Sequence, residues 1–167
     1  PQGYRQAAHE ILGKESKMSE MIASTNVFLN VEAKSVDDVL EFLSSKAVEL
    51  GYADDKDAVL ASFKHREELG STGMADGFAI PYAKDDAIKK PGILVAKLAN
   101  DVAWKSTDDV PVTTAIGLLM PGAEAGTTHL LGLAKVSSML MHEDARKRIA
   151  ESDDPAAIAS VIADAVK

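Results

Sequence analysis

The sequence predicts an α/β fold, a three-layer sandwich with a central sheet between helices, on three observations. The chain has 167 residues, of which 46% are hydrophobic and 26% charged, as is typical of one globular domain. Segments with strand character alternate along it with segments of helical periodicity. Residues 110–120 are almost continuously apolar, as in a strand that is covered on both faces. Helices are therefore expected on both sides of the sheet.

The first strand and the first helix of the sandwich have clear local signals. Residues 27–31 are β-branched and aromatic, which favours a strand. Ser35 then places a capping hydroxyl three residues before the carboxylate of Asp38, so a helix is expected to begin there. Apolar residues recur at helical spacing over residues 36–50, and Gly51 supplies the left-handed stop.

A second helix and a glycine-containing loop follow. The helix opens near Asp54 or Asp55 and ends by residues 69–70. Residues 70–77 include three glycines, which allow positive φ angles and a close approach of the backbone to a ligand. The loop leads into a short apolar strand, residues 78–81, which a proline ends.

Two longer strands are expected in the middle of the chain. Residues 92–98 and residues 110–120 are both rich in apolar and β-branched side chains. Residues 121–127 contain proline and glycine, and they are expected to form a loop.

Two helices are expected in the last quarter of the chain. Asp154 is an N-cap followed by Pro155 at the first helical position, so the last helix runs from there to the end. The earlier helix is capped by Thr127 or Thr128. It runs through Leu130, Leu131, Ala134 and Met141.

The chain divides into a short extension and one domain. Residues 4–20 are polar with a weak helical pattern, so residues 1–17 are interpreted as an N-terminal extension or linker and residues 18–167 as the domain. The alternative is that this segment forms a first helix of the domain itself.

Charge and composition exclude several classes of function. With 18 basic and 26 acidic residues the net charge is -8, which opposes binding to nucleic acid or to an anionic membrane. The absence of cysteine excludes thiol catalysis and thiolate metal sites. No apolar run approaches the roughly 20 residues of a membrane helix, and the first residues lack a secretory signal. A cytoplasmic protein without direct membrane insertion is expected.

Histidines are the first candidates for chemistry, because imidazole can act as nucleophile, base or metal ligand near neutral pH. No ligand cluster has the spacing of a metal site, so neither a metal nor an organic cofactor is expected. His9, His65 and His142 lie in polar or charged segments and are expected to be solvated. His129 follows a glycine-containing loop at a helix start, where free backbone N–H groups favour an anion. It is either a functional residue or an ordinary first-turn residue.

The glycine-containing loop, residues 70–77, is not a Walker motif. It lacks the Gly-Lys-Ser/Thr ending, and a strand rather than a helix follows it. Taken alone, the loop is either a structural connector or a phosphate cradle.

A set of motifs in fixed order carries a resemblance to a known family. These motifs are Arg66-Glu67-Glu68-Leu69-Gly70-Ser71-Thr72-Gly73 running on to Ile80-Pro81, then Lys84, then Lys90-Pro91-Gly92-Ile93, and finally Glu124-Ala125-Gly126-Thr127-Thr128-His129-Leu130. Together they resemble the EIIA domain of the fructose/mannitol class in the bacterial sugar phosphotransferase system. The resemblance extends from about Met18 to the C-terminus.

This resemblance implies a mixed parallel and antiparallel sheet and a phosphoryl relay. In the family, a histidine after the Ile-Pro pair takes a phosphoryl group from the carrier HPr and passes it to an EIIB domain, which can belong to the same polypeptide. Here that position is Tyr82. The resemblance also implies that Arg66, His129 and the Ser71-Thr72-Gly73 turn hold the phosphate.

A tyrosine is poorly suited to the relay. A phenol has a reference pKa of about 10, so at neutral pH only about one in a thousand is ionised. An aryl phosphate ester is also a poorer onward donor than the labile N–P bond of phosphohistidine. The sequence therefore predicts a phosphocarrier domain that does not relay phosphate, in which the ring of Tyr82 packs and its hydroxyl reaches a polar partner.

Two origins of the tyrosine and one more distant function stay open. The tyrosine is either an engineered block at the acceptor or the mark of a natural paralogue that binds a partner without being phosphorylated, as a regulator. A more distant alternative is an enzyme that uses the glycine-containing loop for another phosphorylated ligand.

Overall fold

The structure, a computed structural model, describes residues 21–124 and 127–167, with the side chains of residues 124–130 left outside the description. The predicted extension, residues 1–17, lies outside the described residues, as does the boundary at Met18.

One five-stranded mixed sheet forms the middle layer. Its order is β1-β4-β5-β2, with β3 also paired to β5, so that β2 and β3 follow one another along the same edge of β5. β1 runs parallel to β4, β4 runs antiparallel to β5, and β2 and β3 run parallel to β5. The strands are β1 (Val27–Val31), β2 (Phe78–Ala79), β3 (Tyr82–Asp85), β4 (Gly92–Val102) and β5 (Val112–Pro121).

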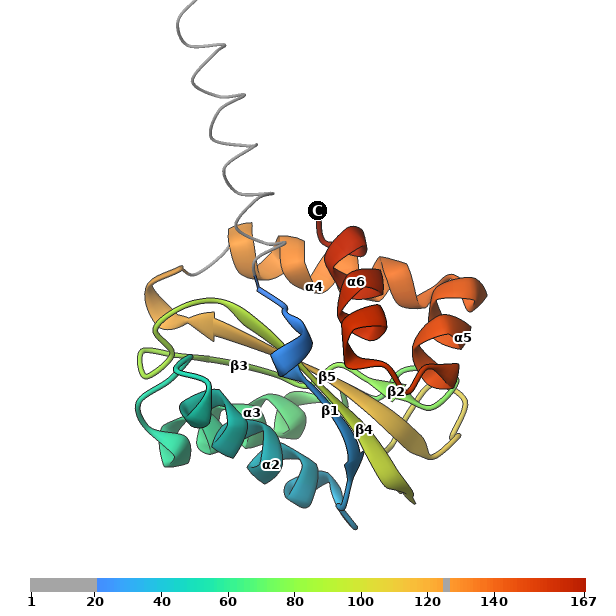
Figure 1. Cartoon of the computed structure of the whole chain (residues 1–167). Coiled ribbons are helices and arrows are strands. Elements are labelled where there is room, and N and C mark those ends of the chain that lie inside the picture. The colour runs from blue at the N-terminus through green and yellow to red at the C-terminus, as the bar shows by residue number, and fades with distance from the viewer. Residues whose placement is uncertain (1–20, 125–126) are drawn as a thin grey trace, which may run out of the picture.

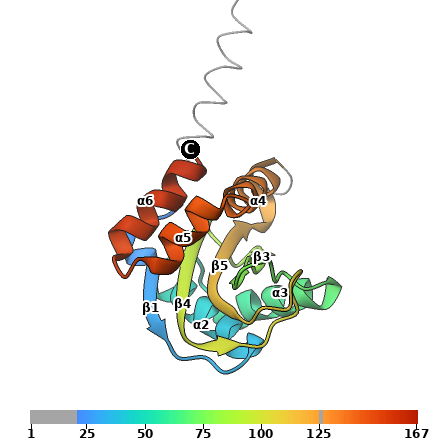
Figure 2. The same ribbon diagram turned by 90° about the vertical axis from the view of Figure 1, so that its right-hand side faces the viewer.

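Helices cover both faces of the sheet, which confirms the predicted three-layer sandwich. α2 and α3 lie on one face, and α4, α5 and α6 lie on the other (Figures 1 and 2). The helices are α2 (Val36–Glu49), α3 (Lys56–Leu69), α4 (Thr127–Leu140), α5 (Glu143–Glu151) and α6 (Pro155–Ala165), and short 3-10 turns are η1 (Ser24–Asn26) and η2 (Gly122–Glu124).

Three helices begin at the side-chain caps that the sequence predicts. The Ser35 hydroxyl accepts a hydrogen bond from the backbone N–H of the third residue after it, at 3.1 Å. Asp55 accepts an equivalent bond at 3.2 Å, and Asp154 accepts one from Ala156 at 3.0 Å. Each cap satisfies a backbone donor that has no partner within its helix. Gly51, with φ of 82°, follows α2 as predicted.

The central strand β5 separates two apolar cores. Ala115 and Leu119 contribute to the core under α2 and α3, whereas Ile116 and Leu118 contribute to the core under α4, α5 and α6. This alternation follows from the period of two in a strand. It explains why both kinds of position along this segment are apolar and confirms the expectation of a strand covered on both faces.

The predicted strand at residues 78–81 is shorter than expected, because β2 ends at residue 79 and the chain leaves the sheet at residues 80 and 81. Proline has no backbone N–H, so Pro81 cannot donate to the ladder, although its carbonyl accepts from Leu118 at 2.9 Å. The N–H of Ile80 turns away from β5 and donates to the carbonyl of Thr72 at 3.0 Å. The chain then rejoins β5 at Tyr82, so β3 is an element that the sequence analysis missed.

The last helices differ from expectation in two respects. α5 was not predicted, because its sequence is mostly charged and only Ile149 is buried in it. In α4 the inward side chains include Val136, Met139 and Leu140, whereas Ala134 is exposed. Met141 is exposed too and lies just past the end of the helix. Apolar side chains occur around much of this helix, so its sequence does not single out one inward face. In the described part of the chain, no helix has the length and apolar character needed to cross a membrane.

Candidate functional site

Arg66 and Tyr82, which are far apart in the sequence, meet at the edge of the sheet. Arg66 lies in the last turn of α3, and Tyr82 is the first residue of β3. The guanidinium carbon of Arg66 lies 4.7 Å from the centre of the Tyr82 ring. Both residues are partly exposed, so the cation–π contact contributes about 0.5–1 kcal/mol.

The break between β2 and β3 sets the direction of the Tyr82 side chain. Tyr82 pairs with Leu118 of β5, and the next residue, Ala83, is buried on the α2 and α3 side. Side chains alternate along a strand, so the Tyr82 ring packs on the opposite side, against the other core. Arg66 is held in turn by a hydrogen bond from Nη1 to the carbonyl of Gly70 at 2.6 Å.

The Ser71-Thr72-Gly73 turn is held by internal hydrogen bonds. The Ser71 hydroxyl donates to the carbonyl of Lys105 and accepts from the N–H of Gly73 at 3.1 Å. Gly73 lies so close to Lys105 that a Cβ there would overlap its carbonyl. The turn is therefore pressed against the segment that follows β4.

Glu67 organises the middle of this turn and was not singled out in the sequence analysis. Its carboxylate accepts the hydroxyl proton of Thr72 and, at 3.2 Å, the backbone N–H of the same residue. It also accepts from the indole N–H of Trp104 at 3.4 Å. Glu67 lies next to Arg66 in the motif, but the partners that reveal its role are 5 and 37 residues away.

The hydroxyls of Ser71 and Thr72 each have one proton, and each donates it inside the protein. Arg66 lies beside Tyr82 and carries a positive charge and N–H donors beyond the one that bonds Gly70. The assignment of Ser71, Thr72 and Gly73 as phosphate ligands stays a prediction.

The far end of the glycine-containing loop is anchored as well. Asp76 has a φ of 62°, and its N–H donates to the carboxylate of Asp108 at 2.9 Å. This hydrogen bond, together with one from the N–H of Val110, lowers the pKa of Asp108. The carboxylate of Asp76 accepts from Nε of Arg146 in α5 at 3.0 Å. Both ends of the loop are thus tied to other elements.

His129 lies in the first turn of α4, in the backbone position that the sequence analysis expects. Its side chain is outside the described residues, so its approach to Tyr82 stays a prediction. His65 and His142 are exposed, as expected. Within the described residues, no three histidine, aspartate or glutamate side chains are grouped so that they could hold a metal ion.

Comparison with known proteins defines the class to which this fold and site belong. Residues 20–165 match the family described as "Phosphoenolpyruvate-dependent sugar phosphotransferase system, EIIA 2". The chain belongs to this family and is an EIIA domain of the fructose/mannitol class, which confirms the resemblance seen in the motifs.

Two relatives show the range of proteins to which the chain is similar. It is 37% identical over 128 residues to the fructose-specific EIIA component of the phosphotransferase system of Haloferax volcanii, covering 77% of this chain and 82% of that protein. It is 32% identical over 146 residues to a nitrogen regulatory protein of Bradyrhizobium diazoefficiens, covering 87% and 94%.

Solved structures agree with the fold. The nitrogen regulatory protein IIA-Ntr of Neisseria meningitidis superposes with a TM-score of 0.80 at 22% identity, over 87% of this chain and 98% of that one. The mannitol enzyme IIA of Escherichia coli, solved in complex with phosphorylated enzyme IIB, gives 0.72 at 19% identity, over 86% and 97%.

Proposed function

We propose that this chain is a phosphotransferase-system EIIA domain that keeps its partner-binding role but does not relay phosphate, because Tyr82 replaces the acceptor histidine. The observation that carries the proposal is the stack of Arg66 on the ring of Tyr82 at 4.7 Å. The family resemblance assigns these two positions to the phosphate-binding arginine and to the acceptor.

The chemistry of the relay supports inactivity. In each step an N–P bond of the donor breaks while a bond forms between phosphorus and the acceptor atom, and the donor imidazole leaves. A phenol must also lose its proton, and with a reference pKa of about 10 it is rarely ionised at neutral pH. Its product is an aryl ester, which is a poorer onward donor of the phosphoryl group than phosphohistidine. A phosphorylated Tyr82 is therefore a trap rather than a relay intermediate.

The surroundings of Tyr82 support a site that differs from a relay site mainly at this one residue. Arg66 lies beside Tyr82, and Glu67 holds the neighbouring turn by a hydrogen bond to Thr72. His129 is proposed as the remaining phosphate partner. No metal or organic cofactor has a part in this scheme.

The proposed partners are HPr, as phosphoryl donor, and an EIIB domain, either as a separate protein or in the same polypeptide. The Escherichia coli relative was solved with its phosphorylated enzyme IIB, which supports the second partner. The proposed setting is cytoplasmic, with residues 18–167 as the EIIA domain and residues 1–17 as an N-terminal extension or linker. Nucleic acid is not a proposed partner, because the net charge of -8 opposes it.

Transfer of radiolabelled phosphate from phosphorylated HPr tests the proposal. We expect no label to reach EIIB through the unchanged chain, whereas Tyr82→His accepts label and passes it on. Tyr82→Phe keeps the ring and lacks any acceptor atom, so it serves as the matched control. Appreciable label on both Tyr82 and EIIB would refute the proposal.

A second function is a regulator that binds its partner without being phosphorylated. The similarity to the nitrogen regulatory protein of Bradyrhizobium diazoefficiens favours this alternative. The two functions predict different phosphoryl transfer by the Tyr82→His variant. Restored relay activity indicates a carrier site with one changed residue, whereas a folded variant that stays inactive and still binds EIIB in calorimetry indicates a regulator.

A further inference from the structure

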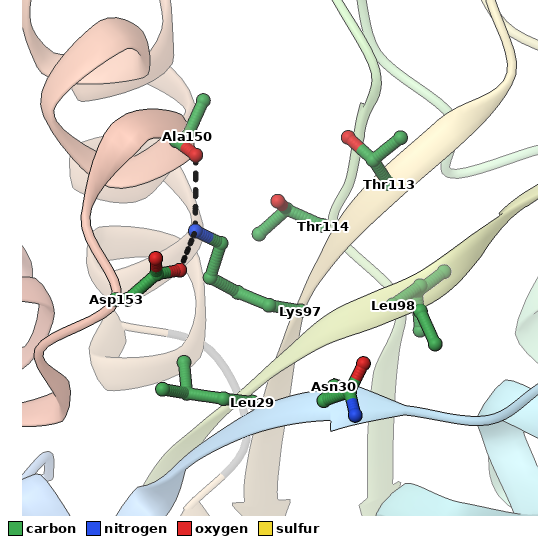
Figure 3. Close-up of a pocket in the computed structure, with 9 residues that line it drawn as sticks. Leu29, Asn30, Lys97, Leu98, Thr113, Thr114, Ala150 and Asp153 are labelled. Atoms are coloured by element: carbon green, nitrogen blue, oxygen red, sulfur yellow. Dashed lines mark hydrogen bonds and ion pairs between the residues drawn. The ribbon is translucent and has the colours of Figure 1, made fainter.

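A polar cavity lies on the same side of the sheet as α5, away from Tyr82. Its volume is about 530 Å³, and it lies between the ends of β1 and α5 and the start of β5 (Figure 3). Thr114 in this cavity is four residues along β5 from Leu118, the pairing partner of Tyr82. At a rise of about 3.4 Å per residue, the two sites are roughly 14 Å apart along the strand.

Lys97 places a largely buried ammonium group in the cavity wall. Its side chain is only 14% exposed, and Nζ donates to the carbonyls of Ala150 at 3.0 Å and Ser152 at 2.6 Å. An ammonium has three N–H donors. The third finds no hydrogen-bond acceptor among the described residues, because the nearest carboxylate oxygen, on Asp153, is 4.0 Å away.

Thr114 adds a buried hydroxyl beside this ammonium. The residue is 1% exposed, yet its hydroxyl forms no hydrogen bond with any residue that the structure describes. Buried polar side chains nearly always have a partner, so an unpartnered hydroxyl in a cavity wall indicates a place for a ligand atom. Figure 3 shows Thr114 and the end of Lys97 on the same side of the sheet. Both offer a proton to an oxygen acceptor.

Asp153 places the opposite charge at the rim of the same cavity. Its carboxylate is 96% exposed and accepts no hydrogen bond from the part of the chain that the structure describes. Its Oδ1 forms a long ion pair with Nζ of Lys97 at 4.0 Å (Figure 3), so a ligand with a single charge at this place meets one attractive and one repulsive group. A ligand that carries both charges a few ångströms apart satisfies Lys97 and Asp153 together.

We propose that this cavity binds the zwitterion of an α-amino acid with an aliphatic side chain. The ligand carboxylate accepts from Lys97 and Thr114, and the ligand ammonium faces Asp153. Leu29, which packs on the α4, α5 and α6 side of the sheet, lines the cavity and provides apolar contact for the ligand side chain. Binding here involves no phosphoryl chemistry and no atom of Tyr82, so it is separable from the proposed function.

Titration of the ¹⁵N-labelled chain with L-leucine, followed by amide NMR shifts, tests this proposal. We expect saturable shifts centred on Lys97, Thr114 and Asp153. The same titration with 4-methylpentanoate, which lacks the ammonium, and with isopentylamine, which lacks the carboxylate, gives binding weaker by about tenfold or more. Absence of saturable shifts with leucine, or equal binding of either half-ligand, overturns the proposal.

Two variants with a matched control locate the binding. Thr114→Val removes the hydroxyl at nearly constant volume, and Asp153→Asn removes the rim charge; each weakens leucine binding about fivefold to tenfold. Thr107→Val, at an exposed threonine outside the cavity, leaves binding unchanged. Lys97 is not replaced, because it also holds the end of α5. If Thr114→Val does not fold, the exposed Asp153→Asn decides alone, and binding equal to that of Thr107→Val overturns the proposal.

Discussion

Replacing Glu67 by alanine tests whether this carboxylate holds the turn beside Tyr82. The change removes the acceptor for three donors, which are the hydroxyl and backbone N–H of Thr72 and the indole N–H of Trp104. Thr72 is buried, with 6% of its surface exposed, so water replaces these bonds only in part.

The expected loss follows from the two close bonds. A hydrogen bond to a charged group contributes about 1.5–3 kcal/mol, and the long bond to Trp104 at 3.4 Å adds little. Because Glu67 is partly exposed, the lower end applies to each bond, so Glu67→Ala is expected to lower the free energy of unfolding by about 3 kcal/mol. For a domain of this size that corresponds to a fall in Tm of about 6–12 °C.

Urea denaturation and calorimetry of Glu67→Ala measure this loss. The neighbouring Glu68→Ala is the matched control, since Glu68 is exposed and forms no hydrogen bond within the described residues. Its effect is expected to stay within about 0.5 kcal/mol. If the two variants unfold at the same urea concentration, Glu67 does not hold the turn and the reasoning is wrong.

Three further predictions concern single positions. Gly73→Ala forces a Cβ against the carbonyl of Lys105 and is expected to destabilise the domain by about 1–3 kcal/mol, measured by urea denaturation; unchanged stability would contradict the contact. In Gly132→Ala, inside α4, the new Cβ meets only the flexible end of a side chain at 3.4 Å, so the variant is expected to stabilise the domain by about 0.5–1 kcal/mol in the same assay. A loss of stability would show that the methyl group does not fit there. The carboxyl pKa of Asp108, lowered chiefly by the N–H of Asp76, is expected below 3.8 in a ¹³C NMR titration. The ionised Asp108 carboxylate then stabilises the fold fully above pH 3.8, and this stabilisation is lost as the pH falls through the lowered pKa of the folded state. A measured pKa at or above 3.8 would contradict the hydrogen bond.

Local signals predicted most of the helices and strands. Ser35 and Asp154 cap helices through their own side chains, so the information lies within four residues of the helix start. The apolar segment that became β5 also carries its own signal, because burial on both faces requires apolar side chains at every position. α5 escaped prediction because its helical face is mostly solvated and only Ile149 reaches the core.

The candidate site was predicted in part. The position of Tyr82 follows from the Ile-Pro pair before it, and that of Arg66 from the motif, but nothing local indicates that the two side chains stack. Glu67 was passed over because charged residues on the exposed part of a helix are usually solvated. Its role depends on Trp104, which a different part of the chain supplies.

The sequence alone determined the family and most of the helices and strands, because the motifs, the helix caps and the apolar segments each lie in residues close together along the chain. The tertiary structure decided that β2 and β3 share one edge of β5, that Arg66 covers Tyr82, and that Lys97 and Thr114 line one polar cavity. These are contacts between segments separated by many residues. They arise only when burial of the two cores fixes the register of the sheet, and no short stretch of sequence contains that information.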